Sequence, residues 1–165
     1  MKMLTTKHSI EKWLTKMGVP DYTINDDLTV DVAGHVDLDK MKLKYLPVQF
    51  GTVNGFFAVM ENQLTSLKGC PHTANDLYAS NNNLINLDYH PTHINDKFSF
   101  HTNGIDHGNI VKLLFLDMKF VGRASMDVKY YRAERIINKH LPSKDILSCV
   151  DELLEAGYAE LCHGI

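Results

Sequence analysis

The residues best suited to chemistry in this sequence are thiols and imidazoles near its C-terminus. Cys149 and Asp151 form a Cys-x-Asp pair, and a thiolate beside a carboxylate can act as a nucleophile. Cys162 is followed directly by His163, and His140 precedes both cysteines. A cysteine-based enzyme with its chemistry in this tail is therefore one reading of the sequence.

The pattern around Cys149 favours a different role for that residue. Cys149 lies between Ile146 and Val150, on the apolar stripe of a helix expected within residues 143–157. A small cysteine in such a stripe is typically part of the core, and Cys162 lies in a terminus that is expected to fray. We therefore predict that the protein is not an enzyme.

The histidines do not predict a metal site. His90 and His93 are three residues apart, and a structural or catalytic metal needs three or four converging ligands. These two flank a proline on an expected return leg, whereas His101 is expected on a strand, so the three should not meet. The sequence also lacks a Gly-rich phosphate loop and a His-Glu-x-x-His motif, and we predict no cofactor.

Composition narrows the class of protein further. The chain has 165 residues, 44% of them apolar, and a formal net charge of −3, which implies no large basic field for nucleic acid. Its three cysteines are an odd number without framework spacing, which is typical of reduced thiols. No apolar run is long enough for a signal peptide or a membrane span, so we expect a cytoplasmic protein without membrane partners.

The middle of the chain is a repeat. Its anchors are Leu43, Leu64, Leu84 and Ile105, which are separated by 21, 20 and 21 residues. Apolar residues recur seven and five positions before each anchor. These two rows are Val36, Phe57, Leu77 and Phe98, and then Leu38, Val59, Ala79 and Phe100. A period near 20 predicts a solenoid in which each unit is one coil.

Asparagine and proline mark the turns of this repeat. Asn62, Asn82 and Asn103 fall where a side-chain amide can satisfy backbone groups as the chain leaves each strand. The first unit has Met41 in place of the Asn, which predicts a looser first coil. Gly108 stands where the next Leu belongs, so we expect the coils to end at residue 106.

The segments "YTINDDLTVDVAGHVDL", "GFFAVMENQLTSLKGCP" and "NNNLINL" resemble the short leucine-rich-repeat-like proteins encoded by large tailed bacteriophages. The resemblance covers roughly residues 9–106. It implies a protein-binding scaffold and brings no catalytic residues with it. Some bacterial effectors join leucine-rich repeats to a helical ubiquitin-ligase domain with a Cys-x-Asp motif, but that domain is several times longer than this tail.

Helices are expected at both ends of the coils. Ser9 is a candidate N-cap, and the apolar residues that follow it have helical spacing up to a stop at Gly18. We therefore expect an α/β (α+β) fold in three parts: residues 1–34 form a helix and a lead-in strand, 35–106 form about four leucine-rich-repeat coils, and 107–165 form an extension of three helices.

Function should then lie on the outward positions of the parallel strands, which make one continuous face. The predicted partner-binding residues are Asp37, Phe56, Ala58, Met60, Glu61, Tyr78, Ser80, Asn81, Ser99 and His101. Large apolar groups on a face that meets water are typical of protein interfaces. We expect this face to bind and modulate a host or phage protein. The alternatives are the cysteine enzyme and a self-associating structural element.

Overall fold

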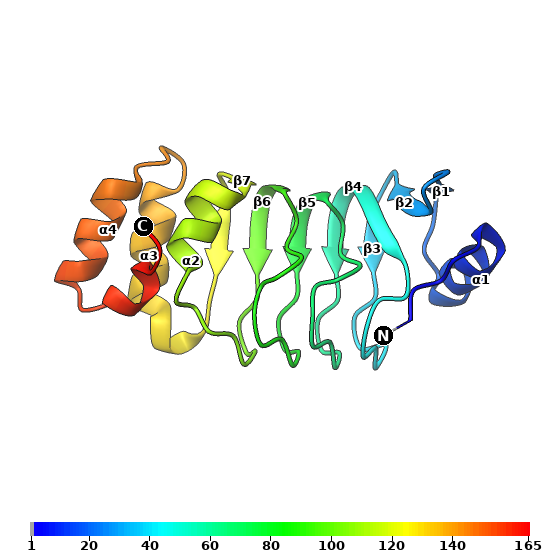
Figure 1. Ribbon diagram of the computed structural model, residues 1–165, viewed down its shortest axis with the longest axis horizontal. Helices are drawn as coiled ribbons and strands as arrows, with labels where there is room; N and C mark the ends of the chain where they lie inside the picture. The colour runs from blue at the N-terminus through cyan, green and yellow to red at the C-terminus, as the bar shows by residue number, and fades with distance from the viewer. Residues whose placement is uncertain (1) are drawn as a thin grey trace.

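A computed structural model describes residues 2–165 as an elongated molecule of mixed α/β structure. Its centre is a β-solenoid of about three turns, and its four helices lie towards the ends. Helix α1 is at one end, and α3 and α4 are at the other (Figure 1). Among the described residues, no helix is both long and apolar enough to cross a membrane.

Helix α1 (Lys7–Met17) caps the N-terminal end of the solenoid. Ile10 and Leu14 are buried on its inner side, as the spacing predicted. Gly18 ends the helix in the left-handed conformation, with φ of 71°. The predicted N-cap was wrong, because the side chain of Thr6 accepts the hydrogen bond from the backbone N–H of Ser9.

A β-hairpin connects this helix to the coils. Strands β1 (Tyr22–Ile24) and β2 (Thr29–Val32) pair in antiparallel fashion, and β2 then pairs in parallel with β4 (Gln49–Ala58). Val30 and Val32 point into the core, so the alternation in this segment did predict its buried side.

Four parallel strands form the body of the sheet: β3 (Val36–Asp37), β4, β5 (Thr73–Tyr78) and β6 (His93–Ser99). The two apolar rows identified in the sequence run across these strands, and none of their eight side chains is accessible to solvent. Val36 pairs with Phe57, Phe57 with Leu77 and Leu77 with Phe98, which is the register that the repeat predicted.

The three asparagines join successive coils. The Nδ2 group of Asn82 donates to the carbonyls of Val59, Ala79 and Ser80, and its Oδ1 accepts from the N–H of Leu64. Asn62 and Asn103 make the equivalent contacts in their own coils. The residue before each asparagine adopts a positive φ, between 54° and 56°. The predicted role of these amides is therefore confirmed.

The parallel sheet does not end at residue 106, where we expected the coils to stop. Strands β7 (Lys119–Phe120) and β8 (Arg123–Ser125) both pair with β6 in parallel. Phe98 pairs with Ala124, 26 residues further on, whereas the earlier units are 20 or 21 residues long. The added length holds helix α2 (Ile110–Lys112) and the π-helical turn η1 (Leu113–Asp117), which replace the extended return leg and hid this unit from the repeat alignment.

The remaining elements cover the last strand. They are the 3₁₀ turn η2 (Val128–Tyr130), α3 (Tyr131–His140), α4 (Ile146–Glu155) and the 3₁₀ turn η3 (Ala159–Cys162). The amide of Asn138 on α3 donates to the carbonyl of Ala124 and accepts from its N–H, at 2.9 and 2.8 Å. These two bonds stand in for the next strand of the ladder, so α3 closes the edge of the sheet.

Candidate functional site

The outward side chains of the parallel strands form the candidate site, which we call the strand face. It consists of three rows that cross the strands in register. They are His35, Phe56, Asp76, Lys97 and Arg123; Asp37, Ala58, Tyr78, Ser99 and Ser125; and Asp39, Met60, Ser80, His101 and Asp127. Because side chains alternate along a strand, the neighbours of these residues fill the core and hold the face in place.

Large apolar groups gather in the first half of this face. The ring of His35 stacks on Phe56, with centroids 4.2 Å apart, and Phe56 meets Tyr78 edge to face at 6.3 Å. Phe56, Met60 and Tyr78 are only half-buried, as expected for residues that meet water on one side. Phe56 and Tyr78 thus lie together on adjacent strands, and Met60 follows on the same face two residues after the end of β4.

Three of the predicted contact residues are not exposed, which corrects the expectation that they meet solvent. Ala58, Ser80 and Ser99 have at most 4% of their surface accessible. Each is small and lies beside a larger outward neighbour, and the hydroxyls of Ser80 and Ser99 hydrogen-bond each other at 2.8 Å. They form a floor between the larger side chains.

The other predicted residues lie at the ends of the strands and differ in exposure. Asp37, Glu61 and Asn81 are exposed, and His101 is half-buried. Glu61 pairs with Lys40 at 3.3 Å, and the ring of His101 contacts the hydroxyl of Thr102. These residues rim the aromatic cluster and do not converge on any one point.

Charge is distributed unevenly over the strand face. Asp37, Asp39 and Glu61 lie at its N-terminal end, and burial together with these neighbouring carboxylates raises the pKa of Asp39. Lys97 lies over the ring of Tyr78, 5.6 Å from its centroid. Burial and the nearby Asp76 raise the pKa of the Tyr78 hydroxyl, so it is a neutral hydrogen-bonding group at neutral pH.

Sequence reasoning missed His35 and the last strand of this face. His35 precedes the first apolar row and was not assigned a role, although its Nδ1 accepts from the N–H of Phe56 at 3.1 Å. Arg123, Ser125 and Asp127 were placed in a helical extension because their unit is longer than the others. The 26-residue spacing from Phe98 to Ala124 was the only signal for them.

The thiols are poorly placed for chemistry. Cys149 is fully buried, and burial raises its pKa to about 12. Burial also raises the pKa of Cys70 and of Cys162 above the ordinary range. His140 hydrogen-bonds the carboxylate of Glu152 at 2.9 Å, which ties α3 to α4. Within residues 2–165, no three His, Cys, Asp or Glu side chains converge as a metal site would require.

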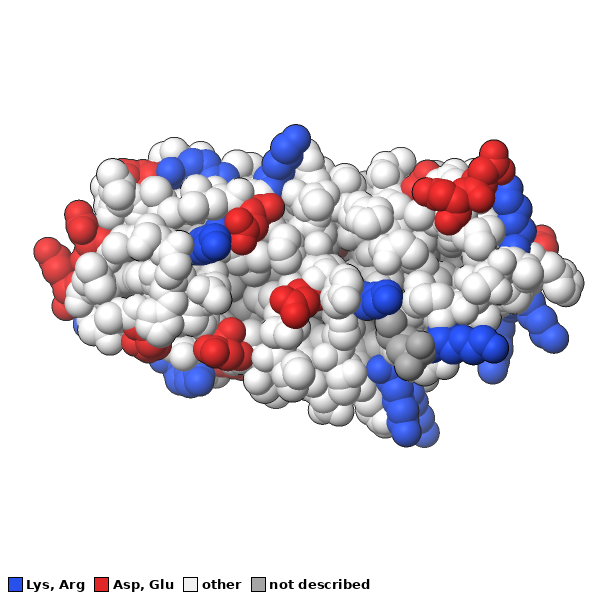
Figure 2. All heavy atoms as spheres, in the orientation of Figure 1, with Lys and Arg blue, Asp and Glu red and all other residues white. Residues whose placement is uncertain are grey.

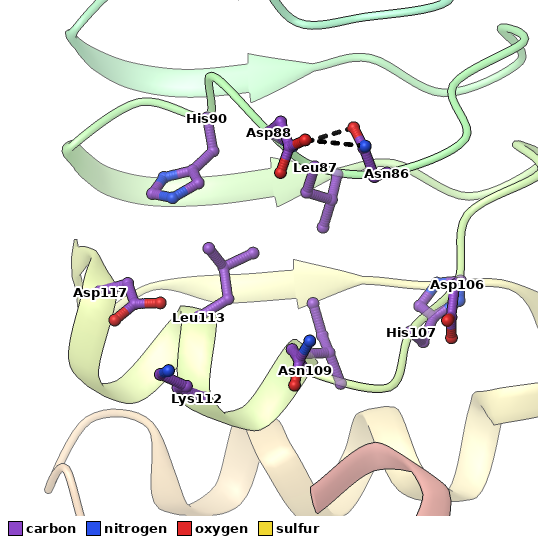
Figure 3. A pocket seen from close by; sticks show the side chains of 11 residues that line it. Asn86, Leu87, Asp88, His90, Asp106, His107, Asn109, Lys112, Leu113 and Asp117 are labelled. Atoms are coloured by element: carbon purple, nitrogen blue, oxygen red, sulfur yellow. Dashed lines mark hydrogen bonds between the residues drawn. The ribbon is translucent and has the colours of Figure 1, made fainter. Parts of the chain in front are cut away.

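A small groove lies between the last extended return leg and α2. It has a volume of about 250 Å³, and Figure 3 shows His90 and Leu113 at its two sides. Asn86 donates to Asp88 across its rim at 2.8 Å. Its carboxylates are spread along the groove, and His93 and His101 take no part in its lining.

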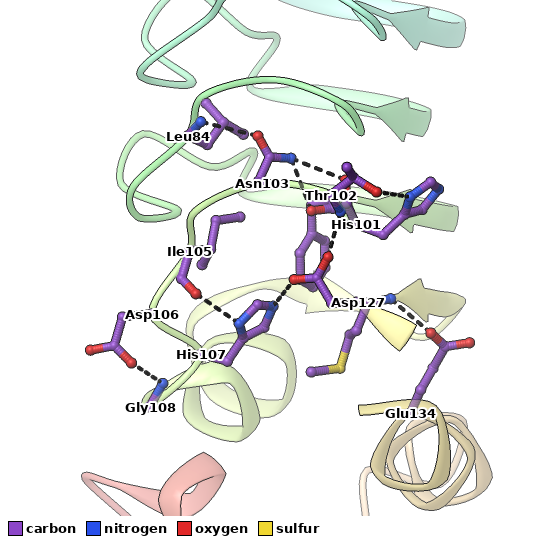
Figure 4. Close-up of polar contacts among 12 residues, drawn as sticks. Leu84, His101, Thr102, Asn103, Ile105, Asp106, His107, Gly108, Asp127 and Glu134 are labelled. Atoms are coloured by element: carbon purple, nitrogen blue, oxygen red, sulfur yellow. Dashed lines mark hydrogen bonds and ion pairs between the residues drawn. The ribbon is translucent and has the colours of Figure 1, made fainter. Parts of the chain in front are cut away.

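One histidine that lines this groove is buried without a full set of partners. His107 donates from Nδ1 to the carbonyl of Ile105 at 2.9 Å, and its Nε2 lies 3.8 Å from Oδ2 of Asp127 (Figure 4). That Nε2 has no hydrogen-bond partner in the described chain. Asp127 uses its other oxygen to accept from the N–H of Thr102, so the segment after β8 is tied to the turn that follows β6.

Comparison with protein-family models, with curated proteins and with solved structures finds no match to this chain.

Proposed function

We propose that the protein is a non-catalytic binding module that holds a protein partner on its strand face. The observation that carries this proposal is the half-buried pair of Phe56 and Tyr78 on neighbouring strands, with the half-buried Met60 on the same face just after β4. Aromatic residues and methionine are enriched at the centres of protein interfaces, where a few such groups supply most of the binding energy.

The rigidity of the face supports the same proposal. The residues on either side of Phe56 and Tyr78 along their strands include Phe57, Leu77 and Ala79, none of which is accessible to solvent. A side chain that is already ordered loses little entropy when a partner binds, so its contact area contributes more fully to affinity. The floor of small residues beside the cluster leaves room for side chains of the partner.

The finer assignment follows the sequence resemblance. We propose that the coils are leucine-rich repeats, that the protein is encoded by a bacteriophage, and that it acts in the host cytoplasm. Its partner would be a host or phage protein whose activity changes on binding. Support for this assignment comes from the length of 20 to 21 residues that the units up to β6 share, and from the asparagines Asn62, Asn82 and Asn103 at three of the turns.

The cysteine enzyme is the less well supported alternative. A nucleophilic cysteine needs a substantial thiolate fraction at neutral pH, and the buried thiol of Cys149 has a pKa of about 12. Self-association through the same face would use the same residues. It would appear as a concentration-dependent mass in sedimentation.

Affinity capture from bacterial lysate tests the proposal when parent and variants are compared quantitatively. Met60→Asp together with Tyr78→Asp places two negative charges among these apolar groups. We expect the amount of a stoichiometric partner captured from the lysate to fall at least tenfold. The matched control is Thr65→Asp with Asn83→Asp, which adds the same charge at exposed positions on the return legs. The control should capture the partner as the parent does.

Thermal unfolding keeps this comparison interpretable. Met60 and Tyr78 lie outside the buried rows, so the double variant should unfold within a few degrees of the parent. A partner that the double variant retains would show that the strand face is not the binding site.

A further inference from the structure

The first return leg departs from the repeat in a way that the fold does not require. Residues 40–45 alternate lysine with an apolar residue, in the order KMKLKY. Met41 takes the place of the asparagine found in the later coils, and 46% of its surface is exposed. Tyr45 is 40% exposed, whereas Leu46 directly after it is fully buried. Apolar groups that this leg does not use for packing are thus left on the surface.

Four residues of this leg, Lys42 to Tyr45, form one wall of a groove of about 750 Å³, and Met41 lies just outside it. The other wall is the chain before α1 together with the first half of that helix, and the N–H of Leu4 donates to the carbonyl of Pro47 at 2.7 Å to hold the two walls together. Trp13 and Tyr45 are the aromatic residues in the lining of the groove, and its other apolar residues are Met3, Leu4, Leu43 and Pro47. None of the residues that line it belongs to the strand face.

The charge of the groove is one-sided. Lys2, Lys42 and Lys44 line it, and no carboxylate does. Within residues 2–165 none of these three lysines forms a salt bridge, in contrast to Lys40, which pairs with Glu61. Figure 2 shows Lys and Arg side chains gathered at this place near the N-terminus, with no Asp or Glu among them. The whole chain carries a net charge of −3, so this is a local excess of positive charge.

We propose that this groove is a second binding site, which takes an acidic peptide segment of a partner protein with one aromatic or aliphatic side chain. The apolar side chain would enter between Trp13 and Tyr45, and flanking carboxylates would pair with Lys42 and Lys44. The site does not depend on the strand face, and either one can be correct without the other.

The surroundings of the groove favour a peptide over an extended anionic surface. Three lysines match the charge of a short segment, and the apolar walls are recessed between two parts of the chain. A membrane or a nucleic acid would also meet the exposed carboxylates at Asp26 and Asp27 beyond α1, and Glu61 beside Lys40. These carboxylates would repel a large polyanion and so weaken its binding.

The protein carries its own probe for this site, because Trp13 is its only tryptophan. We would titrate the full chain with the peptide Glu-Glu-Glu-Phe-Glu-Glu-Glu and follow the intrinsic tryptophan fluorescence. We expect a saturable change in Trp13 emission that weakens as salt is added. Replacing the central Phe of the peptide by Gly should weaken binding at least fivefold, because the apolar contact is lost.

Charge reversal tests the lysines. Lys42→Glu with Lys44→Glu should weaken peptide binding at least tenfold, since two attractions become repulsions. The matched control, Lys12→Glu with Lys16→Glu, makes the same change at exposed positions of α1 outside the groove and should bind within about twofold of the parent.

Other results would overturn the proposal. These are an absence of saturation at about millimolar peptide, equal weakening by the two double variants, and equal binding of the Gly peptide. Anionic lipid vesicles or a single-stranded DNA oligonucleotide that bind more tightly than the peptide would identify a different class of ligand. A Tyr45→Ser variant adds a readout for the apolar wall, since it leaves the lysines in place and should weaken the Phe peptide more than the Gly peptide.

Discussion

At the scale of single residues, the asparagines are the side chains on which the coils depend most directly. Asn82 is 7% exposed and makes four hydrogen bonds to backbone groups of two coils. Asn82→Ala leaves these groups without partners, so we expect the free energy of unfolding to fall by about 1–3 kcal/mol. Urea denaturation measures this loss.

The neighbouring Asn83 is the matched control, because its side chain is exposed. Asn83→Ala should change the free energy of unfolding by no more than about 0.5 kcal/mol. Similar losses in both variants would mean that the hydrogen bonds of the Asn82 amide add nothing to stability beyond the effect of placing alanine in this turn.

His107 is expected to make the stability of the fold depend on pH. Burial lowers the pKa of this imidazole, and the opposing attraction of Asp127 does not make up the difference. A pKa below the unfolded value means that the folded chain prefers the neutral ring. Stability from His107 is thus fully present above the unfolded pKa and is lost as the pH falls through that value towards the folded pKa.

We therefore expect the free energy of unfolding to drop on acidification, and His107→Gln to make this drop smaller. The measurement is a series of urea titrations of parent and variant between about pH 8 and about pH 5, which brackets the ordinary titration of histidine. The relevant quantity is the difference between the two proteins as a function of pH. A constant difference over this range would rule out a lowered pKa for His107.

At the scale of elements, α3 works as the last strand of the sheet. Asn138 pairs with both backbone groups of Ala124, and Glu134 accepts from the N–H of Met126 at 2.7 Å. Asn138→Ala would leave the edge of β8 partly unpaired, and we expect a loss of about 1–3 kcal/mol in the free energy of unfolding. An open edge also invites pairing with another molecule, so the variant should self-associate at high concentration.

Sedimentation and urea denaturation check both effects against Arg135→Ala, an exposed substitution on the same helix. The Arg135 variant should stay close to the parent in stability and in mass. A fully monomeric Asn138→Ala protein of parental stability would show that packing of α3 alone closes the edge.

Sequence periodicity predicted those elements whose burial follows a fixed spacing. The rows through Phe57 and Val59 were found because every coil from β3 to β6 repeats within one residue of the same length. The turn asparagines were found for the same reason. The elongated unit before β8 was not, since α2 and η1 change its length to 26 residues. The pairing of Asn138 with Ala124 depends on how α3 docks in three dimensions, which no local pattern encodes.

At the strand face, too, the sequence predicts only part of what the structure shows. Alternation along a strand predicts which side chains point outward, and that holds for Phe56, Met60 and Tyr78. It does not predict whether an outward side chain is accessible. Ser80 and Ser99 point outward and are nevertheless buried, because larger residues on adjacent strands cover them.

At the scale of the whole molecule, the two ends share one core. Buried apolar residues form a single cluster that runs from Ile10 in α1 through every strand row to Leu161 in η3. The C-terminal helices are thus not a separate module with a core of their own. Lys144 reinforces this continuity, since its ammonium donates to the carbonyl of Leu114 in η1 at 2.9 Å.

A continuous core in a short solenoid predicts one cooperative unfolding transition, because no single coil can bury its own apolar rows. The chain offers a probe at each end: the fluorescence of Trp13 in α1 and the reactivity of Cys149 in α4 (Figure 1). Cys149 is the thiol to follow in a Cys70→Ala, Cys162→Ala background, and we expect its labelling midpoint in urea to coincide with that of the Trp13 signal. Labelling of Cys149 at a lower urea concentration would instead show that α3 and α4 open independently. In that case the β8 edge could open while the rest of the molecule stays folded, and the sheet would then be exposed to association with another molecule.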